Sequence, residues 1–224
     1  MSTMTNYSAL LVATWVVCAG TAAASSAAVA AQDAAPKAGP QAASKPAQPA
    51  AAPGTAAPAT HYTQAAAGNS LAFGFMQADA LNEGSFRKFS TELDYDDRNL
   101  AASTLKVTVQ VASLDTRDQD RDDTLKSAEL LDTAKYPTAQ YVASSLAKRA
   151  DGKIEAVGKL TLRGVTRELR LPLTLKPTAS GLELSGETTI RRLDYEVGQG
   201  DWKSTEWVGN NIKLKYQVAL IRAR

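Results

Sequence analysis

The chain has 224 residues, of which 25 are Lys or Arg and 23 are Asp or Glu, so its formal net charge is only +2. A charge balance this even provides no broad basic surface for a nucleic-acid backbone, and we expect no DNA- or RNA-binding function. The length allows one or two domains. Alanine is crowded into the N-terminal part of the chain, which favours one compact domain preceded by a long N-terminal region.

The chain begins with an export signal pattern. An apolar run at 9–19 is followed by small residues that end at Ala30 or Ala31. This order is typical of a secretory signal peptide, and the run is too short for a bilayer, which needs about 20 apolar residues. We predict a signal peptide at 1–31. Because no Lys or Arg precedes the run, an uncleaved anchor is the alternative. Cys18, the only cysteine, lies within it, so a mature chain would have no disulfide.

The next segment, 32–60, holds six of the nine prolines, interleaved with Ala, Gln, Ser and Lys. It has no amphipathic period and too little bulky apolar surface to offset the entropy lost on ordering. We therefore predict a disordered linker, with a Pro-rich recognition ligand as the alternative.

From residue 61 onward, apolar residues recur at every second position with polar residues between them. This alternation predicts strands with one face in water and one in an interior. The predicted strands lie at 71–75, 89–95, 105–111, 140–146, 154–162, 169–175, 182–190 and 212–220. Turn signals such as those at 96–99, 151–153 and 179–181 separate them and favour antiparallel pairing.

One stretch, 115–136, breaks the alternation and is densely charged. Leu125, Ala128 and Glu129 follow a helical spacing within it, and Pro137 ends it, so we predict one or two helical turns. A meander of about eight strands avoids exposed edges most simply by closing. The fold class we predict is all-β: an eight-stranded antiparallel barrel with one short helical excursion.

Several motifs occur in an order and spacing that resemble the YceI-like polyisoprenoid-binding family, and the resemblance covers 61–224. The motifs are SLDTR at 113–117, RDDTLKSAELLD at 121–132, KYPT at 135–138, GKLTLRGVT at 158–166 with LPL at 171–173, and RLDYEVG at 192–198, and phenylalanines match at Phe73, Phe86 and Phe89. The resemblance implies a lipocalin-like barrel in the bacterial periplasm. Its elongated apolar pocket would accept an isoprenoid chain, such as a quinone or prenyl-phosphate tail, with no resident cofactor.

The chain also departs from that family. Relatives commonly carry histidines near the positions held here by Gly68, Gln77, Thr124 and Arg163, whereas His61 is the only histidine of this chain. A histidine-dependent role is therefore not expected. The segment 198–209 is similar to the subgroup found beside membrane b-type cytochromes, which suggests a membrane redox partner by analogy. The sequence is also compatible with a homodimer.

The chain offers little material for catalysis. A hydrolase needs a nucleophile, a base and an orienting group, and one histidine at the edge of a linker cannot supply them. The glycines Gly198 and Gly200 lack the Lys-Ser/Thr of a phosphate loop. The acidic residues between Asp115 and Asp123 lack the glycine and terminal glutamate of a calcium loop. We predict neither an enzyme nor a metal site.

The candidate ligand-contacting residues are apolar and face the predicted interior. They are Phe73, Phe75, Phe86, Phe89, Leu93, Val109, Tyr141, Leu160, Leu162, Ile190, Trp202 and Trp207. The candidate headgroup residues are cations near the predicted mouth, because a carbonyl or phosphate favours a cationic donor. They are Arg117, Arg121, Lys126 and Arg163. Ordinary core packing is the alternative for the first set, and pairing with nearby aspartates is the alternative for the second.

Two functions are therefore open. One is a binding protein that holds an isoprenoid lipid inside a hollow barrel, as a carrier or reservoir. The other is an envelope interaction module with a solid barrel, which engages a membrane redox partner such as a b-type cytochrome through an aromatic patch around Trp202 and Trp207. A hollow barrel and a filled barrel show the same alternation along their strands, so the pattern does not separate the two.

Overall fold

The computed structural model describes residues 59–223. The predicted signal peptide at 1–31 and the predicted linker at 32–60, apart from its last two residues, lie outside the described residues. Thr60, the last residue of that predicted linker, is the first residue of a strand.

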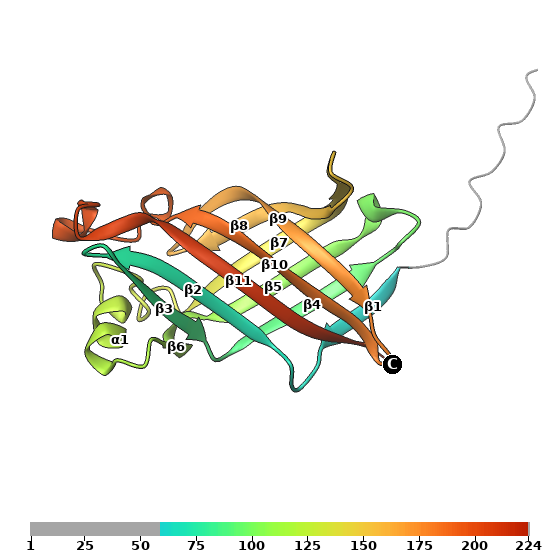
Figure 1. The fold of residues 1–224 in the computed structure, drawn as a ribbon, viewed down its shortest axis with the longest axis horizontal. Coiled ribbons are helices and arrows are strands. Elements are labelled where there is room, and N and C mark those ends of the chain that lie inside the picture. The colour runs from blue at the N-terminus through green and yellow to red at the C-terminus, as the bar shows by residue number, and fades with distance from the viewer. Residues whose placement is uncertain (1–58, 224) are drawn as a thin grey trace, which may run out of the picture. The chain divides into compact units, whose positions relative to one another are not determined.

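Within residues 59–223, eleven antiparallel strand segments form one sheet that closes into a barrel (Figure 1). They are β1 (Thr60–Gln64), β2 (Ser70–Gln77), β3 (Ala80–Phe86), β4 (Phe89–Tyr95), β5 (Thr104–Gln110), β6 (Leu114–Asp115), β7 (Thr138–Lys148), β8 (Ile154–Leu162), β9 (Val165–Pro177), β10 (Gly181–Arg191) and β11 (Val208–Arg222). The ring order is β1-β4-β5-β7-β8-β9-β10-β11, and β11 pairs with β1 to close it.

The eleven segments occupy eight positions around the barrel, because three of the eight barrel strands are each broken into two segments. These pairs of segments are β1 with β2, β3 with β4, and β5 with β6. β1 and β2 lie along the same edge of β11, since Leu220 pairs with Gln64 of β1 while Leu214 pairs with Phe73 of β2. β3 and β4 likewise pair with β2 and β1, and β6 and β5 pair with β3 and β4. The predicted eight-stranded antiparallel barrel is confirmed.

The predicted helical excursion is also confirmed. The helix α1 spans Gln119–Lys126, and the Asp118 carboxylate caps its N-terminus by accepting a hydrogen bond from the Arg121 backbone N–H. The buried Asp122 carboxylate accepts from the backbone N–H and the hydroxyl of Thr116, at 2.8 and 2.7 Å, and so fixes the helix to the end of β6. Among residues 59–223, no helix is both long and apolar enough to cross a membrane.

Short 3₁₀ turns complete the described part of the chain. They are η1 (Leu100–Ala102), η2 (Val111–Ser113), η3 (Arg192–Tyr195) and η4 (Gly200–Lys203). The last two lie between β10 and β11, in the connection that approaches α1 at one end of the barrel (Figure 1).

The two ends of the barrel differ in their interior. We call the end that carries β1 the β1 end, and the end that carries α1 the α1 end (Figure 1). At the β1 end, Leu93, Leu105 and Leu220 are 0 to 1 % exposed and pack in one continuous apolar cluster. At the α1 end, two smaller clusters centred on Phe73 and on Tyr195 line the wall. The space between them is the candidate functional site.

Candidate ligand-binding cavity

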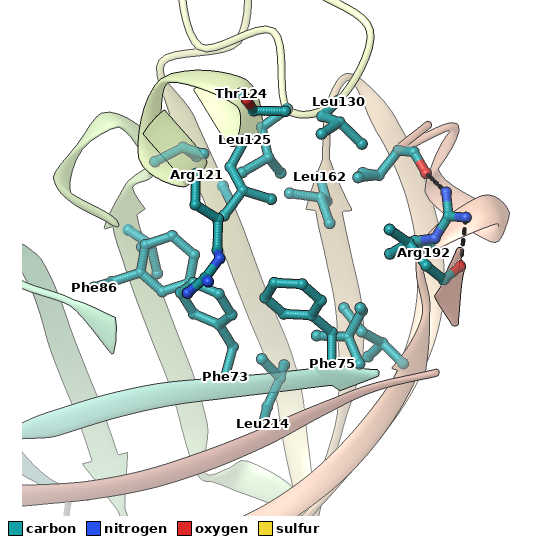
Figure 2. A pocket seen from close by; sticks show the side chains of 18 of the residues that line it. Phe73, Phe75, Phe86, Arg121, Thr124, Leu125, Leu130, Leu162, Arg192 and Leu214 are labelled. Carbon is teal, nitrogen blue, oxygen red and sulfur yellow. Dashed lines mark hydrogen bonds between the residues drawn. The ribbon is translucent and has the colours of Figure 1, made fainter. Parts of the chain in front are cut away.

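The α1 end holds a cavity of about 470 Å³ (Figure 2). This volume lies in the range of about 300–1,000 Å³ that is usual for small-molecule sites. Its lining is mostly aliphatic and aromatic, and the side chains come from β2, β3, β5, β7, β8, β10 and β11 as well as from α1 and the two connections near it. The cavity is therefore an interior of the barrel that its own side chains leave unfilled.

Three phenylalanines form one wall. The rings of Phe73 and Phe75, both on β2, are stacked with centroids 6.3 Å apart, and Phe86 on β3 lies 5.1 Å from Phe73 at a tilt of 43°. Gly84 faces Phe73 across the β2–β3 pair, and a Cβ added there would meet the Phe73 ring at 2.4 Å. Because Gly84 has no side chain, it leaves room for the Phe73 ring in this wall.

The polar lining gathers at α1 and at the end of β2. Asp118, Asp120, Arg121 and Thr124 line the cavity from the helix side, and Gln77 lines it from β2. Figure 2 shows the Arg121 side chain reaching down from α1 toward Phe86 and Phe73. Its Nη2 lies 3.3 Å from the Asp118 carboxylate, and its side chain keeps 31 % exposure. The cavity therefore has an apolar interior and a polar mouth with a cation at its rim.

Arg192 organises the opposite side of the cavity and is only 2 % exposed. All five of its N–H groups donate to backbone carbonyls at 2.7 to 3.1 Å; some of these bonds are drawn as dashed lines in Figure 2. The acceptors belong to Val197, Trp202, Ser204, Val208 and Gly209. Burial lowers the pKa of Arg192. One side chain thus fixes the connection between β10 and β11.

Gly198 is required beside that arginine. Its φ is +109°, a conformation that L side chains rarely adopt. A Cβ there would lie 2.1 Å from Arg192 Nη1 and 2.6 Å from the Trp202 carbonyl oxygen. The motif at 192–198 is therefore structural: the arginine and the glycine are its first and last residues, and together they shape the cavity wall.

Four hydrogen bonds join the segment after α1, the β8–β9 turn and the β10–β11 connection. Trp202 Nε1 donates to the Glu129 carboxylate at 2.9 Å, and the Gln199 N–H donates to the Glu129 carbonyl at 2.7 Å. Arg163, in the β8–β9 turn, donates to the carbonyls of Ala128 and Glu196 at 2.7 and 2.9 Å. These bonds hold the rim of the cavity in one arrangement.

A second, smaller cavity of about 100 Å³ lies deeper in the barrel and has an entirely apolar lining surface. The two cavities share five lining residues, which are Leu71, Val109, Ala139, Leu160 and Leu214. The side chains of Tyr141 and Tyr216 line the smaller cavity but not the larger one.

Most of the predicted ligand-contacting residues line these cavities. The larger cavity is lined by Phe73, Phe75, Phe86, Val109, Leu160, Leu162, Ile190 and Trp202, and the smaller one by Phe89, Val109, Tyr141 and Leu160. Two predicted residues line neither cavity. Leu93 is fully buried in the cluster of the β1 end, and Trp207 is 70 % exposed on the outer surface. Contact of any of these residues with a ligand stays a prediction.

Only one of the four predicted headgroup cations lines a cavity. Arg121 does so, and its guanidinium also pairs with Asp118. Arg163 donates hydrogen bonds to the carbonyls of two neighbouring loops, as described above. Arg117 is exposed at φ +63°, and Lys126 is the last residue of α1; neither lines the cavities.

The structure also places the positions at which the family carries histidines. Gln77 and Thr124 line the larger cavity, whereas Gly68 and Arg163 do not. Among residues 59–223, no group of three or more His, Cys, Asp or Glu side chains is placed to hold a metal ion. His61 lies on β1 and pairs with Asp94 at 2.6 Å. This hydrogen bond holds the pKa of Asp94 below its usual value.

Sequence reasoning missed Arg192, Gln77, Thr124 and Leu130 as parts of this site. The motif at 192–198 was the available signal for Arg192. An arginine at the end of an amphipathic strand, however, has the same pattern as a surface charge, because its acceptors lie up to 17 residues away in the chain.

Comparison with known proteins gives consistent results. A family model described as the YceI-like domain matches residues 62–220. A UPF0312 protein of Vibrio vulnificus is 36 % identical over 89 residues, which are 40 % of this chain and 47 % of that protein. Protein YceI of Shigella sonnei is 39 % identical over 92 residues, 41 % of this chain and 48 % of that protein. The chain thus spans about half the length of the curated relatives it matches.

Solved structures share the fold. BcnA of Burkholderia cenocepacia is 28 % identical, with a TM-score of 0.64 over 67 % of this chain and 94 % of that chain. A polyisoprenoid binding domain from Saccharophagus degradans is 14 % identical, with a TM-score of 0.59 over 74 % of this chain and 99 % of that chain. At that identity, the second likeness extends to the fold alone.

Proposed function

Because the chain belongs to the YceI-like domain family, we propose that it binds an isoprenoid lipid with its apolar tail in the cavity of the α1 end. The observation that carries the proposal is the cavity of about 470 Å³, lined mostly by apolar side chains and bounded by a polar rim at α1. The solved polyisoprenoid binding domain with the same fold supports the choice of ligand class.

The driving force for such binding is the burial of the tail. Each tail carbon removed from water contributes roughly 0.8 kcal/mol of favourable binding free energy. Association costs about 4–15 kcal/mol, because the lipid and the protein lose translational and rotational freedom. A tail of several isoprenoid units is therefore needed before binding becomes favourable. Selectivity then depends on how much of the tail the cavity accommodates and on the contacts of the headgroup.

Arg121 is the headgroup contact we propose. Its guanidinium is at the rim, reaches into the cavity and is neutralised by one carboxylate whose other oxygen caps α1. A quinone carbonyl or a prenyl phosphate at this place would accept charge-assisted hydrogen bonds from it. The tail would then run toward Phe73 and Phe75.

Binding rather than catalysis fits the composition of the lining. Among the described residues that line the larger cavity, Thr124 is the only hydroxyl, and it donates to the backbone carbonyl of Asp120. The Asp118 carboxylate of the same lining is engaged by Arg121. A nucleophile with a base in reach is the usual minimum for covalent catalysis, and the contacts of the Thr124 hydroxyl and of the Asp118 carboxylate do not form such a pair. The role that fits is a carrier or reservoir in the periplasm, reached through the predicted signal peptide at 1–31.

Native mass spectrometry of the full chain, expressed with its leader and purified from the periplasm, tests the proposal. We expect a population heavier than the polypeptide, whose extra mass is extracted by organic solvent and identified as an isoprenoid. Recovery of the polypeptide mass alone, together with no uptake of added farnesol or ubiquinone, would contradict it.

A second candidate function is docking of a membrane partner on the outer wall. Trp207, Leu81 and Met76 are 70, 63 and 43 % exposed. Met76 pairs with Leu81 across β2 and β3, and the Ala78 N–H donates to the Trp207 carbonyl, so the three residues are neighbours. A redox protein or a second copy of the chain would cover this patch. If Trp207→Ala loses partner binding while it retains lipid, the docking function is supported. If Trp202→Ala loses lipid while partner binding is unchanged, lipid binding alone is supported.

A further inference from the structure

Most of the exposed large apolar side chains gather at the α1 end. Within residues 59–223, five such side chains are exposed, and three of them, Met76, Leu81 and Trp207, are the neighbours described above. We call these three residues the apolar patch. A Cβ added at Gly209 would lie 3.4 Å from the Met76 Cβ, so the start of β11 also contacts this part of β2. The β2–β3 turn and the β10–β11 connection both lie at the α1 end of the barrel (Figure 1).

The apolar patch borders the rim of the cavity. Val208 pairs with Gln77 at the end of β2, and both residues line the larger cavity. Their chain neighbours Trp207 and Met76 are exposed on the outer surface. Because successive side chains of a strand point to opposite faces, the same backbone has the cavity on one side and the patch on the other. Whatever covers the patch therefore lies beside the polar mouth of the cavity.

The turn between β2 and β3 extends the apolar surface to its tip. The two central residues of this turn, Ala78 and Asp79, have φ values of +46° and +62°, as a two-residue hairpin turn requires. Asn, Asp or Gly is usual at the first of these positions, whereas an exposed alanine occupies it here. Ala80 is exposed as well. The tip is therefore narrow and mostly apolar, a form that can enter the headgroup region of a bilayer.

The size of the patch favours a lipid surface over a protein partner. A stable protein interface takes about 20–30 residues and roughly 800 Å² from each side, whereas three large apolar side chains form this patch. A lipid surface needs no matching contact area, because lipid surrounds each side chain that reaches the interface. Trp207 is 70 % exposed, and tryptophan is enriched at membrane–water interfaces because its ring is apolar and its N–H is polar.

The charges around the patch indicate which lipids it meets. In the segments 76–83 and 203–209, which carry the patch, the charged residues are Asp79, Glu83, Lys203 and Glu206, and all four are exposed. Three carboxylates and one ammonium make the surroundings of the patch negative, and anionic headgroups repel such a surface. The complementary surface is a bilayer of zwitterionic lipids, such as phosphatidylcholine or phosphatidylethanolamine.

Building on the proposed function, we propose that the apolar patch docks the protein on a zwitterionic lipid bilayer. Trp207 and Leu81 enter the interfacial region, and the rim of the cavity with Arg121 then lies beside the membrane surface. An isoprenoid dissolved in the bilayer moves into the cavity without crossing bulk water. The docking is weak and reversible, because three side chains bury little apolar surface.

Co-sedimentation with phosphatidylcholine vesicles tests this docking. The full chain is expressed with its leader and purified from the periplasm, so that every variant has the same N-terminal region. Leu81→Ser/Trp207→Ser should lower the partition coefficient at least about tenfold, because two large apolar contacts with the lipid are lost. Vesicles that also contain phosphatidylglycerol should bind the wild type no more strongly than phosphatidylcholine alone.

Val142→Ser is the matched control for the loss of an exposed apolar side chain. Val142 is 46 % exposed on β7, which pairs with none of the strands that carry the patch. Its partition coefficient should match that of the wild type.

A fluorophore on the patch gives a second readout. In a Cys18→Ser background, which removes the only cysteine, Leu81→Cys and Val142→Cys are each labelled with an environment-sensitive dye. Adding phosphatidylcholine vesicles should shift the emission of the dye at position 81 to shorter wavelength. The emission of the dye at position 142 should stay unchanged.

The outcomes separate this inference from the proposed function, because the vesicles contain no isoprenoid. Equal partition of the wild type and Leu81→Ser/Trp207→Ser, or unchanged emission at position 81, overturns membrane docking while lipid binding in the cavity stands. Binding only to vesicles that contain membrane proteins would assign the patch to a protein partner and would also overturn it. Vesicle docking by a protein that takes up no isoprenoid overturns the proposed function alone.

Discussion

The two ends of this barrel are built from the same strands and serve different purposes. At the β1 end, side chains from opposite strands meet across the lumen, and Leu93 is 0 % exposed within that cluster. At the α1 end, Leu162 has the same chemistry and the same alternation but lines the cavity of about 470 Å³ (Figure 2). One sheet can therefore combine a core that provides stability with a cavity that provides binding.

The difference arises where the strands lose their regularity. β6 has only two residues, and the connection that contains α1 follows it, so the wall at this end includes a helix and loops. Gly84 and Asn82 occupy positions on β3 opposite Phe73 and Phe75. Small or polar residues at these places leave the space that an apolar guest needs.

The largest expected effect concerns the loop side of the α1 end. Arg192→Met leaves five backbone carbonyls without their shared donor, and we expect the free energy of unfolding to fall by at least about 3 kcal/mol, because each buried carbonyl that loses its donor costs about 1–3 kcal/mol. The matched control is Arg191→Met, because Arg191 is an exposed neighbour paired with Asp194, and about 0–1 kcal/mol is expected. Equal urea midpoints for the two variants would contradict the structural role of Arg192.

Next in size is the contrast between two leucines. Leu93→Ala should lower the free energy of unfolding by about 2–5 kcal/mol, because it opens a cavity in a filled core. Leu162→Ala should cost less than about 1.5 kcal/mol, because its side chain already borders empty space. Lipid affinity should fall only in the second variant. If urea unfolding showed the larger loss of stability in Leu162→Ala, and lipid titration showed the loss of affinity in Leu93→Ala, the contrast between a filled β1 end and a hollow α1 end would be wrong.

A smaller, ligand-dependent effect is expected at the rim. Arg121→Gln should weaken binding of a prenyl phosphate roughly 10- to 100-fold, the size of a charge-assisted hydrogen bond of about 1.5–3 kcal/mol. Stability should change by less than about 0.5 kcal/mol, because the group is at the surface. Arg117→Gln, which alters an arginine outside the cavity, is the control. Equal affinities of the two variants would exclude Arg121 as the headgroup contact.

The smallest effect belongs to the His61–Asp94 pair on β1 and β4. Because the pKa of Asp94 is lowered by this hydrogen bond, its contribution to stability is present above the ordinary value of 3.8 and is lost as the pH falls through the folded-state pKa. Both side chains are nearly half exposed, so no more than about 0.5 kcal/mol is expected. The free energy of unfolding of His61→Gln, compared with the wild type at pH 7 and at pH 3, measures this contribution. An equal loss of stability at both pH values would contradict a stabilising role of the ionised Asp94 in this hydrogen bond.

The alternating pattern predicted the regular strands and, through their number, the closed barrel, whereas the motifs predicted the family. β1, β3 and β6 were not predicted as separate segments. In β3, Asn82 and Gly84 occupy the positions opposite the phenylalanines, so no apolar alternation appears in the sequence. A strand of this kind is determined by its pairing partner and not by its own composition.

The alternation alone could not predict the hollow space, which only the family resemblance implied. Leu93 and Leu162 are indistinguishable in sequence, and their different surroundings arise from which side chains lie across the lumen. Arg192 and Trp202 depend likewise on distant partners, the carbonyls of the β10–β11 connection and the carboxylate of Glu129. Sequence patterns report which face of a strand is apolar, whereas packing across a barrel depends on all strands together.

The most direct test of the central claim uses the tryptophan in the cavity wall. Trp202 lines the larger cavity, so the variant Trp15→Phe/Trp207→Phe leaves it as the only tryptophan of the chain. Titration with geranylgeraniol should give a saturable change in Trp202 emission with one lipid per chain, and Leu162→Ala in the same background should weaken it. Emission that stays constant while the lipid demonstrably binds would place the guest elsewhere and contradict the account.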